Sequence, residues 1–146
     1  FTRKELESRM EIEYEAYSKA INIEAKAMID IAGKSIIPAV IRYTTRLADS
    51  IIKLKTAMSD IETYAQSSIL IDVNEHLKSA KLALENLIKL MDDAGEIAEA
   101  DKHAGYMRKV IVPAMEELRK PIDELEMIVD KDLWPMPSYG DLLFEV

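Results

Sequence analysis

Cysteine is absent from this sequence of 146 residues, and glycine occurs only four times. Without cysteine there is no disulfide framework, no thiolate metal site and no cysteine nucleophile. The sequence also has no glycine-rich loop followed by Lys-Ser or Lys-Thr, so it has no phosphate-binding loop of that kind. The longest uncharged apolar run, residues 35–41, contains Pro38 and is far shorter than the roughly 20 residues that a membrane-spanning helix needs.

An excess of basic residues is also missing. The net charge is −8, and residues 92–146 hold 14 acidic and 6 basic side chains, whereas residues 1–91 hold 13 of each. Phosphate backbones and anionic membranes are bound by surplus Lys and Arg, so we expect neither nucleic acid nor membrane as a partner. The first residues lack a signal-peptide core and a starting methionine, which predicts a cytoplasmic chain excised from something longer.

Helical apolar spacing runs through nearly the whole sequence. In the first stretch, residues 2–64, the apolar positions follow one another at steps of three or four residues. Pro38 cannot donate a backbone hydrogen bond and disfavours helical angles at Ile37, so we expect a kink near residues 33–38. We interpret this kink as a bend around the core rather than as a hinge.

Two further helices are predicted at residues 73–95 and 101–131, the first of them opened by a capping box between Asp72 and Glu75. Residues 65–71 are expected to form the connection, and Pro113 and Pro121 are expected to kink the last helix without breaking it. The fold class is therefore all-α, a single antiparallel helical bundle built on a long, proline-kinked first helix. Residues 133–146 form an extended tail whose apolar side chains are expected to dock on protein: Trp134, Pro135, Pro137, Tyr139, Leu142, Leu143 and Phe144.

Candidate catalytic and metal-binding residues are few. His76 with Asp72 and His103 with Glu99 stand four residues apart and could touch, but a two-metal bundle would need Glu-x-x-His on two helices, which is absent. A carboxylate cluster at Asp123, Glu126 and Asp130 lies away from the apolar stripe, so a solvated face is expected. Five tyrosines are expected at the core edge rather than in ligand stacking: Tyr14, Tyr17, Tyr43, Tyr64 and Tyr106. We assign no catalytic, cofactor-binding or metal-binding residue.

The end of the chain resembles the carboxyl terminus of type III glutamine synthetases. The most specific part is Leu133-Trp134-Pro135 with Pro137, Tyr139 and residues 140–144. Upstream, the resemblance is carried by Glu7-Ser8-Arg9, Asn22-Ile23-Glu24-Ala25, Ile36-Ile37-Pro38-Ala39, Pro113-Ala114-Met115 and Glu124-Leu125-Glu126. Between residues 56 and 105 the chain resembles the family only in being helical.

The resemblance implies a parent enzyme that joins ammonia to glutamate with ATP and Mg²⁺ or Mn²⁺, in a homo-oligomer whose catalytic motifs lie upstream. On this reading residues 1–146 are a non-catalytic C-terminal domain in contact with the catalytic body of the same polypeptide and with neighbouring subunits. Whether the tail docks on its own polypeptide or on a neighbour stays open. The alternatives are a stand-alone helical bundle that binds a protein partner and, ranked last, a small catalytic bundle using His76 or His103.

Overall fold

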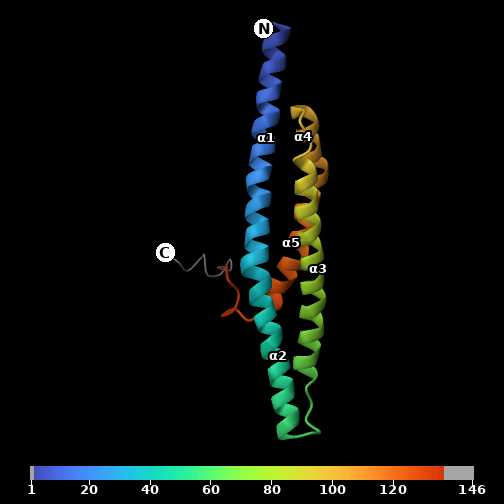
Figure 1. Cartoon of the computed structure of the whole chain (residues 1–146). Coiled ribbons are helices and arrows are strands. Elements are labelled where there is room, and N and C mark those ends of the chain that lie inside the picture. Colours follow the sequence, from blue (N-terminus) through green and yellow to red (C-terminus); the bar gives the residue numbers. More distant parts are fainter. Residues whose placement is uncertain (1, 137–146) are drawn as a thin grey trace, which may run out of the picture.

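The computed structural model describes residues 2–136, in which three long helices run antiparallel (Figure 1). The first consists of α1 (Arg3–Ile31), the π-turn η1 (Ala32–Ile36) and α2 (Ile37–Ala57). The second is α3 (Tyr64–Ala94), and the third consists of α4 (Ala100–Tyr106), the π-turn η2 (Met107–Ile111) and α5 (Val112–Ile128). The described residues contain no strand, so the predicted all-α bundle with a long first helix is confirmed.

The start of α1 is fixed by a capping box. The Thr2 hydroxyl accepts from the backbone N–H of Glu5 at 3.2 Å, and the Glu5 carboxylate accepts from the backbone N–H of Thr2 at 3.3 Å. Two of the backbone donors that a helix start leaves free are satisfied in this way. The helix therefore begins at the first residues of the described chain and runs beyond the end of its neighbours (Figure 1).

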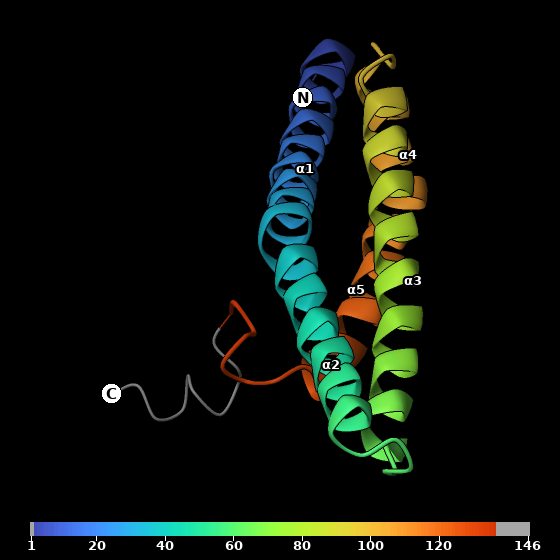
Figure 2. The same cartoon turned by 60° about the horizontal axis from the view of Figure 1, so that its bottom comes forward.

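The predicted interruption near Pro38 is a widened turn. The N–H of Ile37 donates to the carbonyl of Ala32, five residues earlier, and the helix changes direction there (Figure 2). Ile37 keeps helical angles, with φ −57° and ψ −47°, so the expectation that it leaves the helical region is wrong. The π-turn makes room for the proline ring, so the helix bends without breaking.

The last helix repeats this device. Val112 donates to the carbonyl of Met107, again five residues earlier, and Pro113 follows at once. The two sites share a short sequence pattern, Lys-x-Ile-Ile/Val-Pro-Ala, at residues 34–39 and 109–114. Pro121 lies inside α5, which confirms that the third helix continues through both prolines.

The connection between the first two helices lies earlier than predicted. The first helix ends at Ala57, where Met58 turns to extended angles, and α3 starts at Tyr64. Asp72 and Glu75 are thus inside α3 and do not open it. Residues 65–71, the expected connection, are helical. Ile69 lies four residues before Val73 and packs against the same buried cluster, so the apolar face of α3 begins before residue 72.

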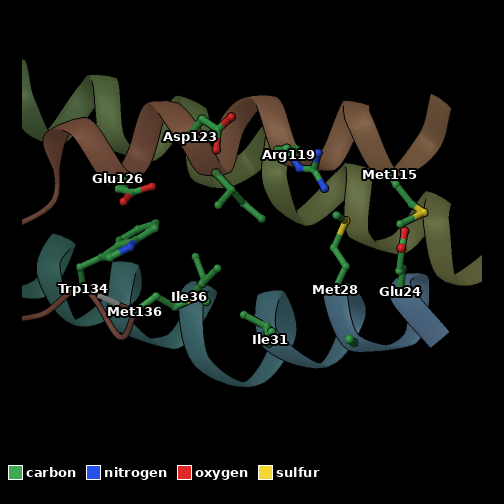
Figure 3. A pocket seen from close by; sticks show the side chains of 12 residues that line it. Glu24, Met28, Ile31, Ile36, Met115, Arg119, Asp123, Glu126, Trp134 and Met136 are labelled. Atoms are coloured by element: carbon green, nitrogen blue, oxygen red, sulfur yellow. The ribbon is translucent and has the colours of Figure 1, made fainter. Parts of the chain in front are cut away.

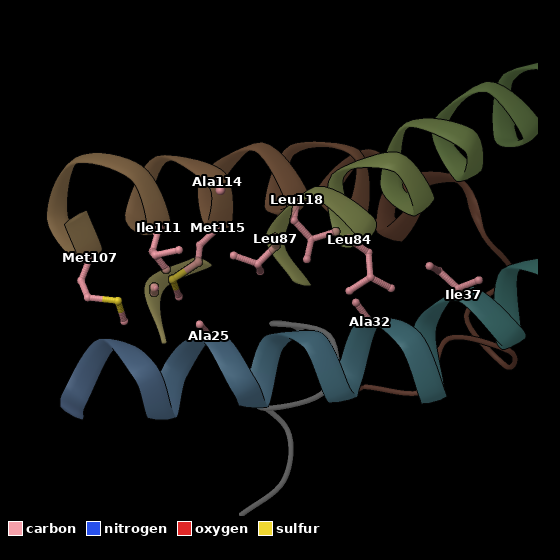
Figure 4. Close-up of a cluster of buried hydrophobic side chains, with 11 residues drawn as sticks. Ala25, Ala32, Ile37, Leu84, Leu87, Met107, Ile111, Ala114, Met115 and Leu118 are labelled. Carbon is pink, nitrogen blue, oxygen red and sulfur yellow. The ribbon is translucent and has the colours of Figure 1, made fainter. Parts of the chain in front are cut away.

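Two clusters of buried side chains form the core. The larger joins α1, α3 and the last helix through residues such as Ala25, Leu87 and Leu118 (Figure 4). The smaller, which includes Val40, Val73 and Leu125, lies towards α2. On the first helix small side chains recur every seven residues in buried positions, at Ser18, Ala25, Ala32 and Ala39. Small side chains at this spacing let neighbouring helices approach closely along one seam.

Ser18 is the one polar member of this seam, and its hydroxyl is buried without a hydrogen-bond partner among the described residues. An unsatisfied buried hydroxyl is unfavourable by about 1–3 kcal/mol. We expect Ser18→Ala to raise the free energy of unfolding by about 1 kcal/mol, measured by urea denaturation. Ser79→Ala, at an exposed position of α3, controls for helix propensity. Equal gains from both variants would contradict this account.

Candidate functional site

The main candidate site is a groove of about 470 Å³ between the first helix and α5 (Figure 3). Its apolar lining comes from both helices and includes Met28, Ile31 and Met115. Its charged lining consists of Glu24, Arg119, Asp123 and Glu126. Size and composition fit a site for apolar groups with a few orienting charges.

One end of the groove is formed by Trp134 and Met136 (Figure 3). A turn after α5 positions the tryptophan, because the carbonyl of Asp130 accepts from the backbone N–H of Leu133 at 2.9 Å and of Trp134 at 3.1 Å. The Asp130 carboxylate accepts from the N–H of Asp132 at 2.9 Å. The Trp134 ring then packs, partly buried, against the smaller core cluster.

Arg119 is the one cation among the residues that line the groove. No carboxylate of residues 2–136 lies within 4.0 Å of its guanidinium, whereas Lys120 next to it pairs with Glu117 at 2.8 Å. Arg119 is exposed, as are Asp123 and Glu126 on the same helix. The groove therefore offers an unpaired positive charge between carboxylates.

The predicted carboxylate cluster is a solvated face, as expected. Asp123 and Glu126 line the groove, while Asp130 lies 3.9 Å from Arg46 and holds the turn after α5. Burial of the Tyr43 ring and, to a lesser degree, the nearby Asp130 raise the pKa of the Tyr43 phenol. Tyr43 consequently packs as a neutral side chain against the smaller cluster.

The two histidines lie on different helices and in different surroundings. His76 contacts Asp72 at 3.4 Å on α3, which confirms the predicted pair. Glu99 pairs with Lys102 at 3.2 Å instead of with His103, whose ring is partly buried. Within residues 2–136 no three His, Cys, Asp or Glu side chains come together as a metal site would require. None of the helices described is long and apolar enough to cross a membrane.

The tyrosines divide into two groups. Tyr14, Tyr43 and Tyr106 are partly buried, in agreement with a place at the core edge. Tyr17 on α1 and Tyr64 at the start of α3 are 38% and 79% exposed, so their predicted place at the core edge is wrong. The predicted first helical stretch reaches residue 64, but the helix ends at Ala57.

A second candidate surface was not recognised as one from the sequence. Residues 3–13 of α1 are all exposed, because the start of the helix extends past α3 and α4 (Figure 1). Leu6 and Met10, the first members of the apolar stripe, are 53% and 43% exposed, and Tyr17 continues the same stripe. We call Leu6, Met10 and Tyr17 the α1 stripe. The signal was present in the spacing, but the spacing alone does not show where partner helices stop.

The predicted docking tail lies only partly within the description. Trp134 and Pro135 are described, and Pro135 is exposed while Trp134 lines the groove. Pro137, Tyr139, Leu142, Leu143 and Phe144 lie outside the described residues.

Comparison with known proteins points to one family. The family model described as glutamine synthetase C-terminal domain matches residues 1–55. A "Type-3 glutamine synthetase" of Dictyostelium discoideum is 31% identical over 144 residues, which cover 96% of this chain and 20% of that protein. A "Glutamine synthetase" of Bacteroides fragilis (strain YCH46) is 29% identical over 99% of the chain and 20% of its own length. One of Butyrivibrio fibrisolvens is 29% identical over the whole chain and 21% of its own length.

The chain thus spans about one fifth of the length of the curated relatives it matches. These matches include residues 56–105, where the sequence motifs alone carried no resemblance beyond helical character. Over nearly its whole length the chain is thus similar to glutamine synthetases, and residues 1–55 match the model of their C-terminal domain.

Proposed function

We propose that this domain is a non-catalytic part of a type III glutamine synthetase, and that it supports the catalytic body and contributes to subunit contacts. The parent reaction is the ATP-dependent joining of ammonia to glutamate. Support comes from the match to only about a fifth of each relative, among them a protein named as a type-3 enzyme. The cytoplasm is the compartment we propose.

ATP and Mg²⁺ or Mn²⁺ belong to the proposed parent reaction. The described residues do not fit the metal ion, because no set of three potential metal ligands converges among them. We assign no residue of this chain to their binding and derive no chemical step here.

The observation that carries the proposal is the α1 stripe. Leu6 and Met10 stay largely exposed on α1, where residues 99–101 cover Met10 only in part, although their spacing continues the buried stripe of the same helix. Apolar side chains in a continuous row stabilise a structure only when they are removed from water, at about 25 cal/mol per Å². The catalytic body of the same polypeptide and a neighbouring subunit are the surfaces we propose for this contact. The docking tail is a second apolar element that we expect protein to cover.

The test uses the enzyme that carries this chain at its C-terminus. We expect Leu6→Gln with Met10→Gln to raise the protein concentration at which half of the oligomer has dissociated about tenfold or more, since 1.4 kcal/mol of lost contact corresponds to a factor of ten. Analytical ultracentrifugation measures the assembly, and glutamine formation reports on the catalytic body.

Ile52→Gln with Leu82→Gln is the matched control, because these side chains are 63% and 55% exposed on α2 and α3. If the α1 variant and the control share unchanged mass and activity at all concentrations, the proposed contact does not exist. A stand-alone interaction module, the alternative function, would then be favoured.

A further inference from the structure

We propose that the groove between α1 and α5 is the binding site for residues 142–144 of the same chain, Leu-Leu-Phe. The occupant is a segment that lies outside the described residues, and the groove is built entirely from described ones. This inference does not rest on the proposed function, because it concerns a contact within one chain and not the assembly of subunits.

The described chain stops at the groove. Trp134 and Met136 both line the groove, so the segment that follows Met136 starts at its edge. A segment tethered at this point has an effective concentration in the millimolar range, which favours it over an untethered competitor. The entry point therefore selects the chain's own tail.

The tail is long enough to reach every part of the groove. The groove extends along the first helix from Ile36 to Glu24, a helical distance of about 18 Å. The eight residues from Met136 to Phe144 reach up to about 26 Å when extended. Leu142, Leu143 and Phe144 can therefore lie anywhere along the groove.

The lining of the groove matches the apolar side chains of the tail. The apolar lining includes Met28, Met115 and Met136, and methionine adapts its shape to different apolar partners. Leu142, Leu143 and Phe144 are three consecutive large apolar residues. Their transfer into the groove is favourable for each side chain by about 1.5–3 kcal/mol when burial is complete.

Charge favours one position in the groove for a tail carboxylate. Asp141 and Glu145 flank the apolar triplet, and Arg119 is the cation of the groove without a carboxylate partner among residues 2–136. A tail carboxylate that reaches Arg119 completes this pair. Glu24, Asp123 and Glu126 leave the groove with a net negative charge that opposes the two tail carboxylates. Burial of the apolar triplet must outweigh this repulsion, and Arg119 is the position in the groove where a tail carboxylate is favoured. The competing occupant is a basic apolar segment of the catalytic body, which these same carboxylates would attract.

Trp134 makes the proposal directly measurable, because it is the only tryptophan of the chain and lies in the groove. In the 146-residue chain we expect Leu142→Ser, Leu143→Ser and Phe144→Ser together to shift its emission to longer wavelength and to increase acrylamide quenching at least twofold. The control combines Ile52→Ser, Leu82→Ser and Met127→Ser, at exposed apolar positions away from the groove, and should leave both signals unchanged. Far-ultraviolet circular dichroism verifies that each variant is folded.

A second measurement supplies the tail separately. A chain ending at Met136 keeps both buried clusters, and a synthetic peptide of residues 137–146 should restore the protection of Trp134, whereas a scrambled peptide should not. Arg119→Glu should weaken this restoration. Unchanged quenching in the triple-serine variant, or restoration by a basic apolar peptide but not by the tail peptide, would overturn the proposal. Neither result would touch the α1 contact, which is tested by assembly.

Discussion

Replacing Leu118 with alanine is expected to lower the free energy of unfolding by about 2–5 kcal/mol. Leu118 has no exposed surface and lies in the larger core cluster, where α5 meets α1 and α3 (Figure 4). Truncation removes apolar contacts and leaves a cavity that helices on three sides cannot close. Urea denaturation followed by circular dichroism measures the change.

The matched control for this variant is Leu82→Ala on the outside of α3, where the leucine is 55% exposed. A substitution at such a position is expected to alter the free energy of unfolding by no more than about 0.5 kcal/mol. If Leu118→Ala is tolerated as well as the control, the larger cluster is not the core of the bundle.

The second large effect is expected from Ala25→Leu, which should destabilise the chain by about 1–3 kcal/mol. Ala25 has no exposed surface and belongs to the seam of small residues that recur every seven positions. A leucine there must push the neighbouring helices apart or take up a strained rotamer. Thermal unfolding would show a lower midpoint.

Ala20→Leu provides the comparison, since Ala20 is exposed on the same helix α1 and both substitutions have nearly the same helix propensity cost. Equal stability of the two leucine variants would mean that the seam has spare room. The close approach of the helices along Ser18, Ala25 and Ala32 would then be wrong.

Much of the fold could be predicted because one-face periodicity is a strong local signal. Leu84, Leu87, Leu118 and Leu125, which the spacing assigns to apolar stripes, are all buried. The end of the first helix could not be predicted, since Met58 and Ile61 continue its rhythm although the chain turns at Met58. Which of two adjoining segments is helical depends on tertiary contacts, and periodicity does not contain them.

The sequence predicted less of the candidate site. Trp134 was recognised as an apolar side chain that needs a partner, and the structure places it at one end of the groove. The other wall, with Met28 and Ile31, could not be predicted, because it requires knowing which face of α1 lies opposite α5. Arg119 gave no signal for the same reason: an arginine on a charged helix face is ordinary until its neighbours are known.

The two π-turns have a consequence for how this bundle tolerates changes in chain length. Gaining one residue inside a regular α-helix rotates everything beyond it by about 100° and turns buried positions outward. A turn closed from Ile37 to Ala32, or from Val112 to Met107, already holds one residue more than an α-turn does. Loss of that residue would turn the π-turn into an ordinary α-turn. The buried positions on either side of the turn would still face the neighbouring helices. These two turns are therefore the points in the long helices where deletion of one residue disturbs the facing of the buried positions least.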